Sequence, residues 1–536
     1  MNIPVNFFMW AMAFLPIIVL IVLMIKFKWG ATEAAPVGLI ITVITGLAFY
    51  KADFTLIAEE SAKGVWNAFV ILLIIWTAIL MYQVGDEAKA FLVIRDGMSK
   101  LLPNELLQVI AMGWIFESFL QGITGFGVPV AVGAPLLIGI GVSPMYAVII
   151  PLLGQAWGNT FGTLGAAWDS LVVSAGLETG SAACYHAALW AAAFLFAWDV
   201  VTGLVISWMY GKGRAVKKGL PAVVVMALIQ GGGEMLLSQV NTTLCNFIPA
   251  VVSLVVLVLM GRMKMYREEW KIEDSPIMRR AESGEAVMEG PKDMTLVQAF
   301  VPYVLLSVLT IVVLTVTPIN HLLSSFSIGL KFPETQTGYG FVNAASDNYS
   351  PFVPFTHASM FLFLSAVIGL VYYKKHGWVA AGGTKRIFVK SIEMTMPSGM
   401  AVVGLVIMSR IMGGTGQTTV LAQGIASVLG TKYIILAPFI GLLGTFMTGS
   451  NMSSNILFGD FQMTTSTLLG VNAPAILGAQ TAGGAIGAAV SPSKIILGTT
   501  TANILGKEGE VLKTMLMITI PATLVIGLIQ FFMIGI

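Results

Sequence analysis

The sequence predicts an all-α polytopic membrane protein, and two observations carry that prediction. Of the 536 residues, 57% are hydrophobic and only 10% are charged, whereas soluble domains carry about 25% charged residues. Runs such as Phe8–Ile25, Val65–Tyr82 and Val301–Val316 contain no Asp, Glu, Lys or Arg, and they approach the length that spans a bilayer. The formal net charge of +2 comes without a basic patch, so nucleic-acid binding is not expected.

About twelve segments are apolar and long enough to cross a bilayer. They are roughly 8–25, 35–50, 64–84, 145–170, 184–208, 220–238, 244–261, 299–317, 357–373, 394–412, 473–500 and 514–535. Two further apolar stretches, 106–140 and 433–470, contain the glycine-rich breaks Gln121–Pro129 and Thr448–Asn455. Non-helical backbone is tolerated at membrane depth only where it is buried or lines a cavity. We therefore predict a re-entrant hairpin at each stretch.

The distribution of basic residues predicts the orientation of the chain. Lys and Arg cluster in the polar segment 262–298, which we expect to be a cytoplasmic linker, whereas segment 318–355 has a single Lys and no Arg and belongs outside. Hairpin 106–140 then enters from the cytoplasm and hairpin 433–470 from outside. The N-terminal half (1–261) and the C-terminal half (299–536) are accordingly expected to be inverted copies.

Matching residues at a fixed offset support this repeat. At an offset of 327 residues, from Gly122 to Gly449, Phe119 matches Phe446. After a two-residue shift the match resumes as Gln155/Gln480, Gly158/Gly483 and Gly162/Gly487. Inverted repeats with helices broken at mid-membrane are typical of secondary transporters.

The two hairpin tips are the predicted substrate site. Half-helix ends expose free N–H groups, which attract anions without a charged side chain. The candidate binding residues are Gln121, Thr124, Gly125, Gln155, Asn159, Ser450, Asn451, Asn455 and Gln480. We expect the broken spans near Gln155–Asn159 and Gln480–Gly484 to complete the enclosure. Tight helix packing by small residues is the alternative reading.

Ionisable residues within spans are candidates for ion coupling, because they are costly to insert. Glu117 lies one helical turn before Gln121, while Asp169 and Lys494 each follow their repeat glutamine, Gln155 or Gln480, by 14 residues. We predict that Asp169 and Lys494 form a buried ion pair, unless Lys494 contacts the substrate directly. Further acidic candidates are Asp199, Glu234 and Asp460, and Arg410 is expected to snorkel near the end of its span.

Other functions find little support in the sequence. The four histidines are scattered and the two cysteines form no ligand pattern, so neither a metal site nor a cofactor is expected. No HExxH, Walker loop or nucleophile elbow occurs, which argues against an enzyme. An anion channel is the alternative from a different class, and it would need a continuous polar pore.

Four stretches resemble the L-lactate permease family of bacterial secondary transporters. They are AFLVIRDGMSKL (90–101), FLQGITGFGVPVAVGAPLLIGIGVSP (119–144), TGSNMSSNILFGDFQ (448–462) and GGAIGAAVSPSKI through GKEGE (483–510). The resemblance implies a multi-pass protein of the bacterial inner membrane, with homo-oligomerisation possible. It also implies proton symport of L-lactate, D-lactate, glycolate and similar 2-hydroxymonocarboxylates by alternating access. A sodium-coupled carrier of another organic anion is the alternative within the transporter class.

Three departures from the family bear on the site. The family's FLEG is FLQG here, so Gln121 replaces an acid, and the family's SPQS is SPSK, which introduces Lys494. The third departure is the stretch GQAWGNTFGTLGAAWD after the first hairpin, which is less apolar than in the family. These departures affect the substrate and the coupling ion rather than the transporter class.

Overall fold

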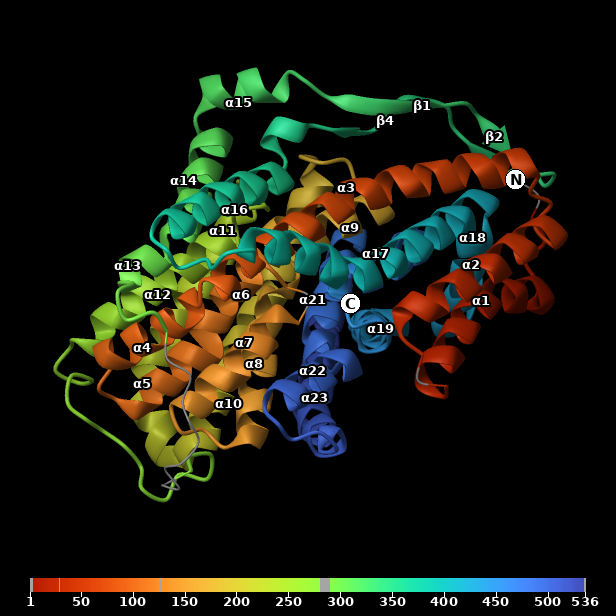
Figure 1. Cartoon of the computed structure of the whole chain (residues 1–536). Helices are drawn as coiled ribbons and strands as arrows, with labels where there is room; N and C mark the ends of the chain where they lie inside the picture. Colours follow the sequence, from red (N-terminus) through yellow and green to blue (C-terminus); the bar gives the residue numbers. More distant parts are fainter. Residues whose placement is uncertain (1–2, 28, 126, 280–289, 535–536) are drawn as a thin grey trace.

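The computed structural model describes residues 3–27, 29–125, 127–279 and 290–534, and it is overwhelmingly helical (Figure 1). The elements up to the linker are α1 (Phe7–Ile25), α2 (Ala31–Ala48), α3 (Phe54–Glu87), α4 (Ala90–Leu101), α5 (Glu105–Ile110), η1 (Ala111–Ile115), α6 (Phe116–Ile123), α7 (Val128–Gly139), α8 (Pro144–Ala156), η2 (Trp157–Asn159), α9 (Gly162–Ser174), α10 (Ala182–Ala227), η3 (Leu228–Gly232), α11 (Gly233–Leu237) and α12 (Phe247–Gly261).

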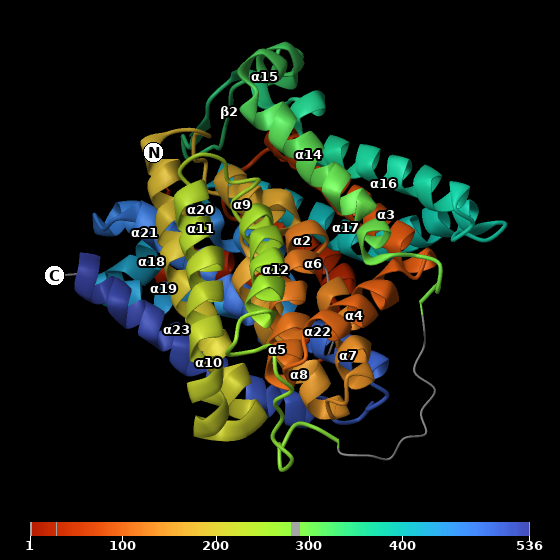
Figure 2. The ribbon, with the colours of Figure 1, turned by 90° about the vertical axis from the view of Figure 1, so that its left-hand side faces the viewer.

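The elements after the linker are α13 (Leu296–Ala299), α14 (Val301–Thr315), α15 (Thr317–Ser324), β1 (Ile328–Phe332), β2 (Thr335–Gln336), β3 (Val342–Asn343), β4 (Ser346–Phe352), η4 (Pro354–Thr356), α16 (Ala358–Lys375), α17 (Gly383–Thr415), α18 (Gln417–Leu429), η5 (Gly430–Lys432), α19 (Tyr433–Thr448), α20 (Asn451–Leu469), α21 (Ala473–Gly487), η6 (Ala488–Val490), α22 (Pro492–Thr501) and α23 (Glu508–Ile534). The strands form two antiparallel pairs, β1 with β4 and β2 with β3. They lie at one end of the molecule, and the described part of the linker lies at the other (Figures 1 and 2).

Ten helices in the described part of the chain are long and apolar enough to span a membrane, or eleven if the bent pair α14 and α15 counts as one span. The predicted number of twelve is not confirmed. Several predicted spans are shorter or more irregular than expected: α12 has 15 residues, and α14 turns by 85° into α15. Predicted span 145–170 is divided between α8 and α9. Hydropathy alone does not show these bends.

The stretch Ala182–Leu237 is helical on both sides of a break at Gly211, and its two helical arms fold back on each other. The backbone leaves helical geometry at Gly211 and Lys212. A Cβ atom on Gly219 would lie 3.0 Å from the Ser207 hydroxyl, and one on Gly203 would lie 2.7 Å from Val223. These contacts pair the arms in antiparallel register, so predicted spans 184–208 and 220–238 correspond to the two arms.

Each glycine-rich tip joins two antiparallel helices. In the first pair, a Cβ on Gly133 of α7 would collide with the Glu117 carboxyl group of α6, and the chain turns at Gly125 with φ +62°. In the second pair, Ser454 of α20 donates a hydrogen bond of 2.9 Å to the Gly441 carbonyl of α19. Gly449 makes that turn with φ +78°, which glycine adopts without the Cβ penalty. That these hairpins enter the membrane from opposite sides stays a prediction.

The two broken spans are interrupted at equivalent positions of the predicted repeat. The first leaves helical geometry at 163–165, where Thr163, Leu164 and Gly165 all have positive φ. The second leaves α-helical geometry at Ala488–Val490. The repeat offset between Gln155 and Gln480 carries 163–165 onto 488–490.

The predicted break near Gln480–Gly484 is wrong, because α21 runs without interruption through Gly487. The glycines there serve close helix packing instead. A Cβ on Gly483 would lie 1.9 Å from the Pro438 carbonyl, and one on Gly441 would lie 1.9 Å from the Gln480 carbonyl. Small residues at such contacts let membrane helices approach backbone to backbone.

Candidate functional site

The tips of the two helix pairs meet around a small cavity. Its lining residues are Gln121, Gly125, Asn159, Gly162, Thr163, Ala166, Ala167, Gly449, Ser450, Asn451, Met452 and Lys494. We call this space the tip cavity. Its volume of about 30 Å³ accommodates a few waters at most, so a larger ligand needs the tips to separate.

Three helices begin at the tip cavity or against its lining. Helix α20 starts at Asn451 after the Ser450 cap, and α7 starts at Val128 after Gly127. The start of α22 lies between these tips, because a Cβ on Gly449 would lie 2.4 Å from the Ser493 hydroxyl, and one on Gly127 would lie 3.9 Å from Cγ of Lys494. Helix N-termini present free N–H groups and positive dipole ends. The arrangement therefore favours an anion.

Lys494 is the one basic residue among the described lining residues of the tip cavity. Its side chain is buried, and Nζ donates a hydrogen bond of 3.1 Å to Oδ1 of Asn159, a neutral partner. No acidic residue is among the described lining residues. A buried ammonium group with only a neutral partner is costly, and a bound carboxylate would offset that cost.

The predicted ion pair between Asp169 and Lys494 is wrong in this conformation. No salt bridge between them occurs among the described residues, and the bond of Lys494 goes to Asn159. Equivalent positions of a repeat meet only close to the axis that relates them. Lys494 lies in the first turn of α22 and faces the tip cavity, whereas Asp169 is not part of the lining.

Asn451 and Asn455 form a brace next to the tip cavity, by which we mean a set of hydrogen bonds between the two halves of the chain. The Asn451 amide donates to the Thr481 carbonyl at 3.1 Å and to the Thr160 hydroxyl at 3.3 Å. The Asn455 amide donates to the Ala167 carbonyl and the Thr481 hydroxyl, both at 2.9 Å. Thr160 and Thr481 contact each other at 3.1 Å. These bonds join the N-terminal half of the chain to the C-terminal half beside the tip cavity.

Half of the twelve predicted site residues line the tip cavity. Those that do are Gln121, Gly125, Asn159, Ser450, Asn451 and Lys494, and those that do not are Glu117, Thr124, Gln155, Asp169, Asn455 and Gln480. Gln480 instead accepts a bond of 2.8 Å from Gln462 and donates one of 3.1 Å to Ser454. Thr160, Thr163, Thr481 and Ser493 were missed, because isolated hydroxyl residues in apolar segments carry no distinctive pattern.

Three buried acids lie behind the first tip. Neither carboxyl oxygen of Glu117 has a hydrogen-bond partner among the described residues. Asp199 accepts a bond of 2.8 Å from the Trp114 indole, and Glu234 accepts one of 3.4 Å from Asn246. Glu117 is therefore the buried acid in this group whose carboxyl oxygens are both left unpaired.

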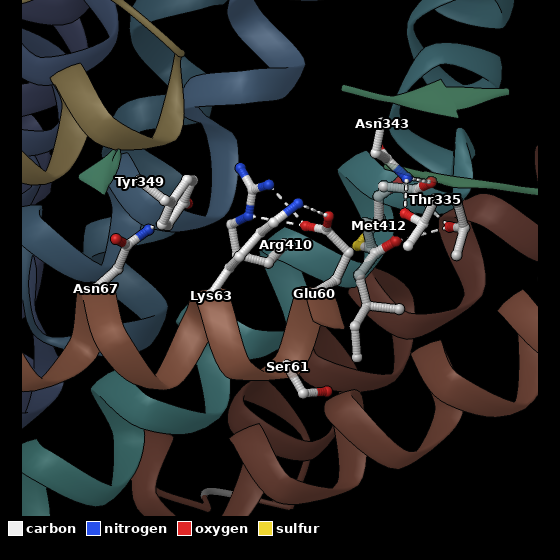
Figure 3. Close-up of polar contacts among 12 residues, drawn as sticks. Glu60, Ser61, Lys63, Asn67, Thr335, Asn343, Tyr349, Arg410 and Met412 are labelled. Carbon is white, nitrogen blue, oxygen red and sulfur yellow. Dashed lines mark hydrogen bonds and ion pairs between the residues drawn. The ribbon is translucent and has the colours of Figure 1, made fainter. Parts of the chain in front are cut away.

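A second polar cluster connects α3 with α17 (Figure 3). Glu60 is fully buried and accepts hydrogen bonds from Arg410 Nη2 at 2.6 Å and from Lys63 Nζ at 2.7 Å. The snorkelling prediction for Arg410 did not include this buried carboxylate as its partner. Sequence reasoning overlooked Glu60, which lies upstream of the predicted span 64–84.

The family model described as L-lactate permease matches residues 10–536 of this chain. The chain belongs to the L-lactate permease family. It is a multi-pass membrane protein, and its named relatives are permeases.

Individual members of the family match over nearly the whole chain. An L-lactate permease of Halalkalibacterium halodurans is 25% identical over 94% of this chain and 92% of its own length. The glycolate permease GlcA of Escherichia coli is 25% identical over 96% and 94%, and the L-lactate permease of that organism is 26% identical over the same shares. Among solved structures, the YdaH transporter of Alcanivorax borkumensis matches with 12% identity and a TM-score of 0.46, over 89% of this chain and 87% of its own.

Proposed function

We propose that this permease imports L-lactate and related 2-hydroxymonocarboxylates, such as glycolate and D-lactate, by proton symport across a bacterial inner membrane. The convergence of Lys494 and three helix N-termini at the tip cavity carries the proposal. It supplies positive charge and free N–H donors at one point, with no opposing acid in the described lining. The names of the relatives supply the substrate class.

Two of the three departures from the family pattern support anion binding at this cavity. Gln121 and Lys494 both line it, so the wall has one acid fewer and one cation more than the family pattern implies. A singly charged carboxylate balances the Lys494 ammonium. Its 2-hydroxyl group can then bond to the polar groups of Asn159 or Ser450 in the same lining.

The way the tips close the cavity supports the proposed alternating access. Because its volume is too small for lactate, the tips have to part on one side at a time to admit substrate. On the side of segment 318–355, α9 and α20 are held together by the bond of 2.8 Å from Ser174 to the Ile456 carbonyl. This contact is the proposed seal on that side.

Glu117 is the proposed proton carrier. It is fully buried one turn before Gln121, and its carboxyl oxygens have no hydrogen-bond partner in the described part of the chain. A charged carboxylate in such a place is not stabilised, whereas a carboxyl group that gains and loses a proton as the tip moves couples the two fluxes.

Counterflow in proteoliposomes tests this function. We expect labelled L-lactate to accumulate in exchange for internal lactate or glycolate, and net uptake to follow an inward proton gradient. Uptake that follows a sodium gradient alone would replace proton coupling with the sodium-coupled alternative. Absence of exchange with all short carboxylates, or flux at channel rates, would contradict the proposal.

A further inference from the structure

A second, larger cavity lies between the tip cavity and the segment 318–355, and we call it the outer cavity. Its volume is about 340 Å³, enough for a small organic acid with hydrating water. Its polar lining comes from Asn67, Ser170, Ser174, Asn343, Ser409, Arg410 and Asp460. It therefore combines polar groups from α3, α9, α17, α20 and β3.

The outer cavity continues from the tip cavity along the same two helices. On α9, Ala166 and Ala167 line the tip cavity, and Ser170 and Ser174 line the outer one. On α20, Met452 lines the first and Ile456 and Asp460 the second. At 1.5 Å per residue, the centres are about two helical turns apart, and the bond from Ser174 to the Ile456 carbonyl joins α9 to α20 at the outer cavity.

Arg410 presents one unused edge of its guanidinium group. Nε and Nη2 both donate to Oε2 of Glu60, at 3.0 and 2.6 Å. Nη1 donates to no described residue, and in Figure 3 one terminal nitrogen of Arg410 carries no dashed line. The edge formed by Nη1 and Nη2 can bind a carboxylate with two parallel hydrogen bonds.

The charges around this edge suit a singly charged ligand. Glu60 is shared by Arg410 and Lys63, so these three groups together carry one excess positive charge. Asp460 is the single acidic residue among the described lining residues of the outer cavity. An ionised Asp460 offsets that excess, so a ligand carboxylate is held by the free Nη1–Nη2 edge of Arg410 rather than by net charge, and a hydroxyl group on the same ligand can donate to Asp460. More highly charged anions would be repelled by that acid.

The segment 318–355 roofs the outer cavity. Asn343 donates a hydrogen bond of 2.9 Å to the Gly414 carbonyl of α17, and the Tyr349 hydroxyl accepts one of 2.9 Å from Asn67 of α3. Phe341, Val342 and Ala344 complete the roof. A ligand held at Arg410 is thus enclosed before it reaches the tips.

We propose that the outer cavity is a second binding site for small 2-hydroxymonocarboxylates, in which Arg410 captures the carboxylate on the outer face before transfer to the tip cavity. This inference rests on the proposed function and adds a site and a sequence of binding events to it. It predicts an asymmetry, because a capture site on one face affects substrate entry from that face alone.

The experiment measures the KM for L-lactate from each face of oriented proteoliposomes. Arg410→Lys keeps the charge beside Glu60 but loses the planar fork. We expect KM from the outer face to rise about tenfold to a hundredfold, the value of a hydrogen-bonded charged contact, and KM from the inner face to stay unchanged. Arg386→Lys, which alters an exposed ion pair with Glu87, is the matched control and should change neither value.

A second variant guards against misfolding of the first. Ser409→Phe fills the outer cavity and leaves the bonds between Glu60, Lys63 and Arg410 in place, so it should also raise the outer KM alone. Equal KM changes from both faces, or no change in either variant, would overturn the outer site while leaving transport itself established. Failure of the unaltered chain to bind lactate and glycolate would overturn the proposed function, and the outer site with it.

Discussion

At the scale of single residues, the tip cavity depends on a few polar groups in an apolar frame. Lys494 donates a hydrogen bond to Asn159, and Asn451, at the start of α20, donates one to the Thr481 carbonyl. The sequence was sufficient to nominate all three, because polar residues beside glycine-rich breaks in apolar segments are rare. It was not sufficient to pair them, since the partner of Lys494 depends on where α22 starts relative to both tips.

Glu117→Gln should separate proton coupling from substrate binding. The amide fits the space beside Gly133 but takes up no proton, so uptake driven by a pH gradient is expected to fall to background. Exchange between equal lactate pools should persist. Glu234→Gln, at a buried acid that accepts a bond from Asn246, serves as the comparison. Persistent proton-driven uptake by the Glu117 variant would remove Glu117 from the coupling step.

Asn451→Ala tests the brace next to the tip cavity. The change removes three hydrogen bonds and leaves the buried Thr481 carbonyl with one partner fewer. We expect a stability loss of about 1–3 kcal/mol and a higher Kd for lactate, because the start of α20 is no longer fixed. Thermal unfolding in detergent and a binding titration measure the two effects. A fully stable variant with native affinity would show that the brace has no role.

At the scale of elements, the sequence predicted the position of the hairpin tips better than the course of the helices. Gly125 and Gly449 turn the chain where the glycine-rich stretches indicated. The bends at Gly211 and between α14 and α15, and the continuous course of α21, depend on tertiary packing. Glycine at a break and glycine at a close helix contact look the same in sequence, which explains the wrong expectation at Gln480–Gly484.

Gly441→Ala tests the backbone contact between α19 and α21. The added methyl group would lie 1.9 Å from the Gln480 carbonyl, so the two helices have to move apart. We expect a loss of about 1–3 kcal/mol or more, seen as a lower unfolding temperature and reduced insertion. Gly509→Ala, in α23 with no atom within 4 Å of the new methyl group, is the control and should be neutral or slightly stabilising. Equal stability of both variants would contradict the packing account.

At the scale of the whole molecule, the proposed alternating access requires α9 and α20 to separate on the side of segment 318–355. A Cβ on Gly459 would lie 3.0 Å from Cβ of Ser174, and a small shift of the two helices brings this pair to the separation of about 3.5–4.5 Å between the Cβ atoms of a disulfide. In a chain whose native Cys184 and Cys245 are replaced by alanine, oxidised Ser174→Cys/Gly459→Cys should lose uptake and regain it on reduction. Each single variant should transport with or without oxidant. Full uptake by the crosslinked protein would show that this contact does not open.

The central claim is that a carboxylate binds between the tips, beside Lys494 and the three helix N-termini. The most direct measurement is a calorimetric titration of the purified full chain with L-lactate, for the unaltered protein, Lys494→Met and the control Lys432→Met. Losing a hydrogen-bonded charge partner costs about 1.5–3 kcal/mol, so we expect Lys494→Met to weaken binding about tenfold to a hundredfold and Lys432→Met to leave it unchanged. Native affinity in a correctly folded Lys494→Met protein would contradict the claim.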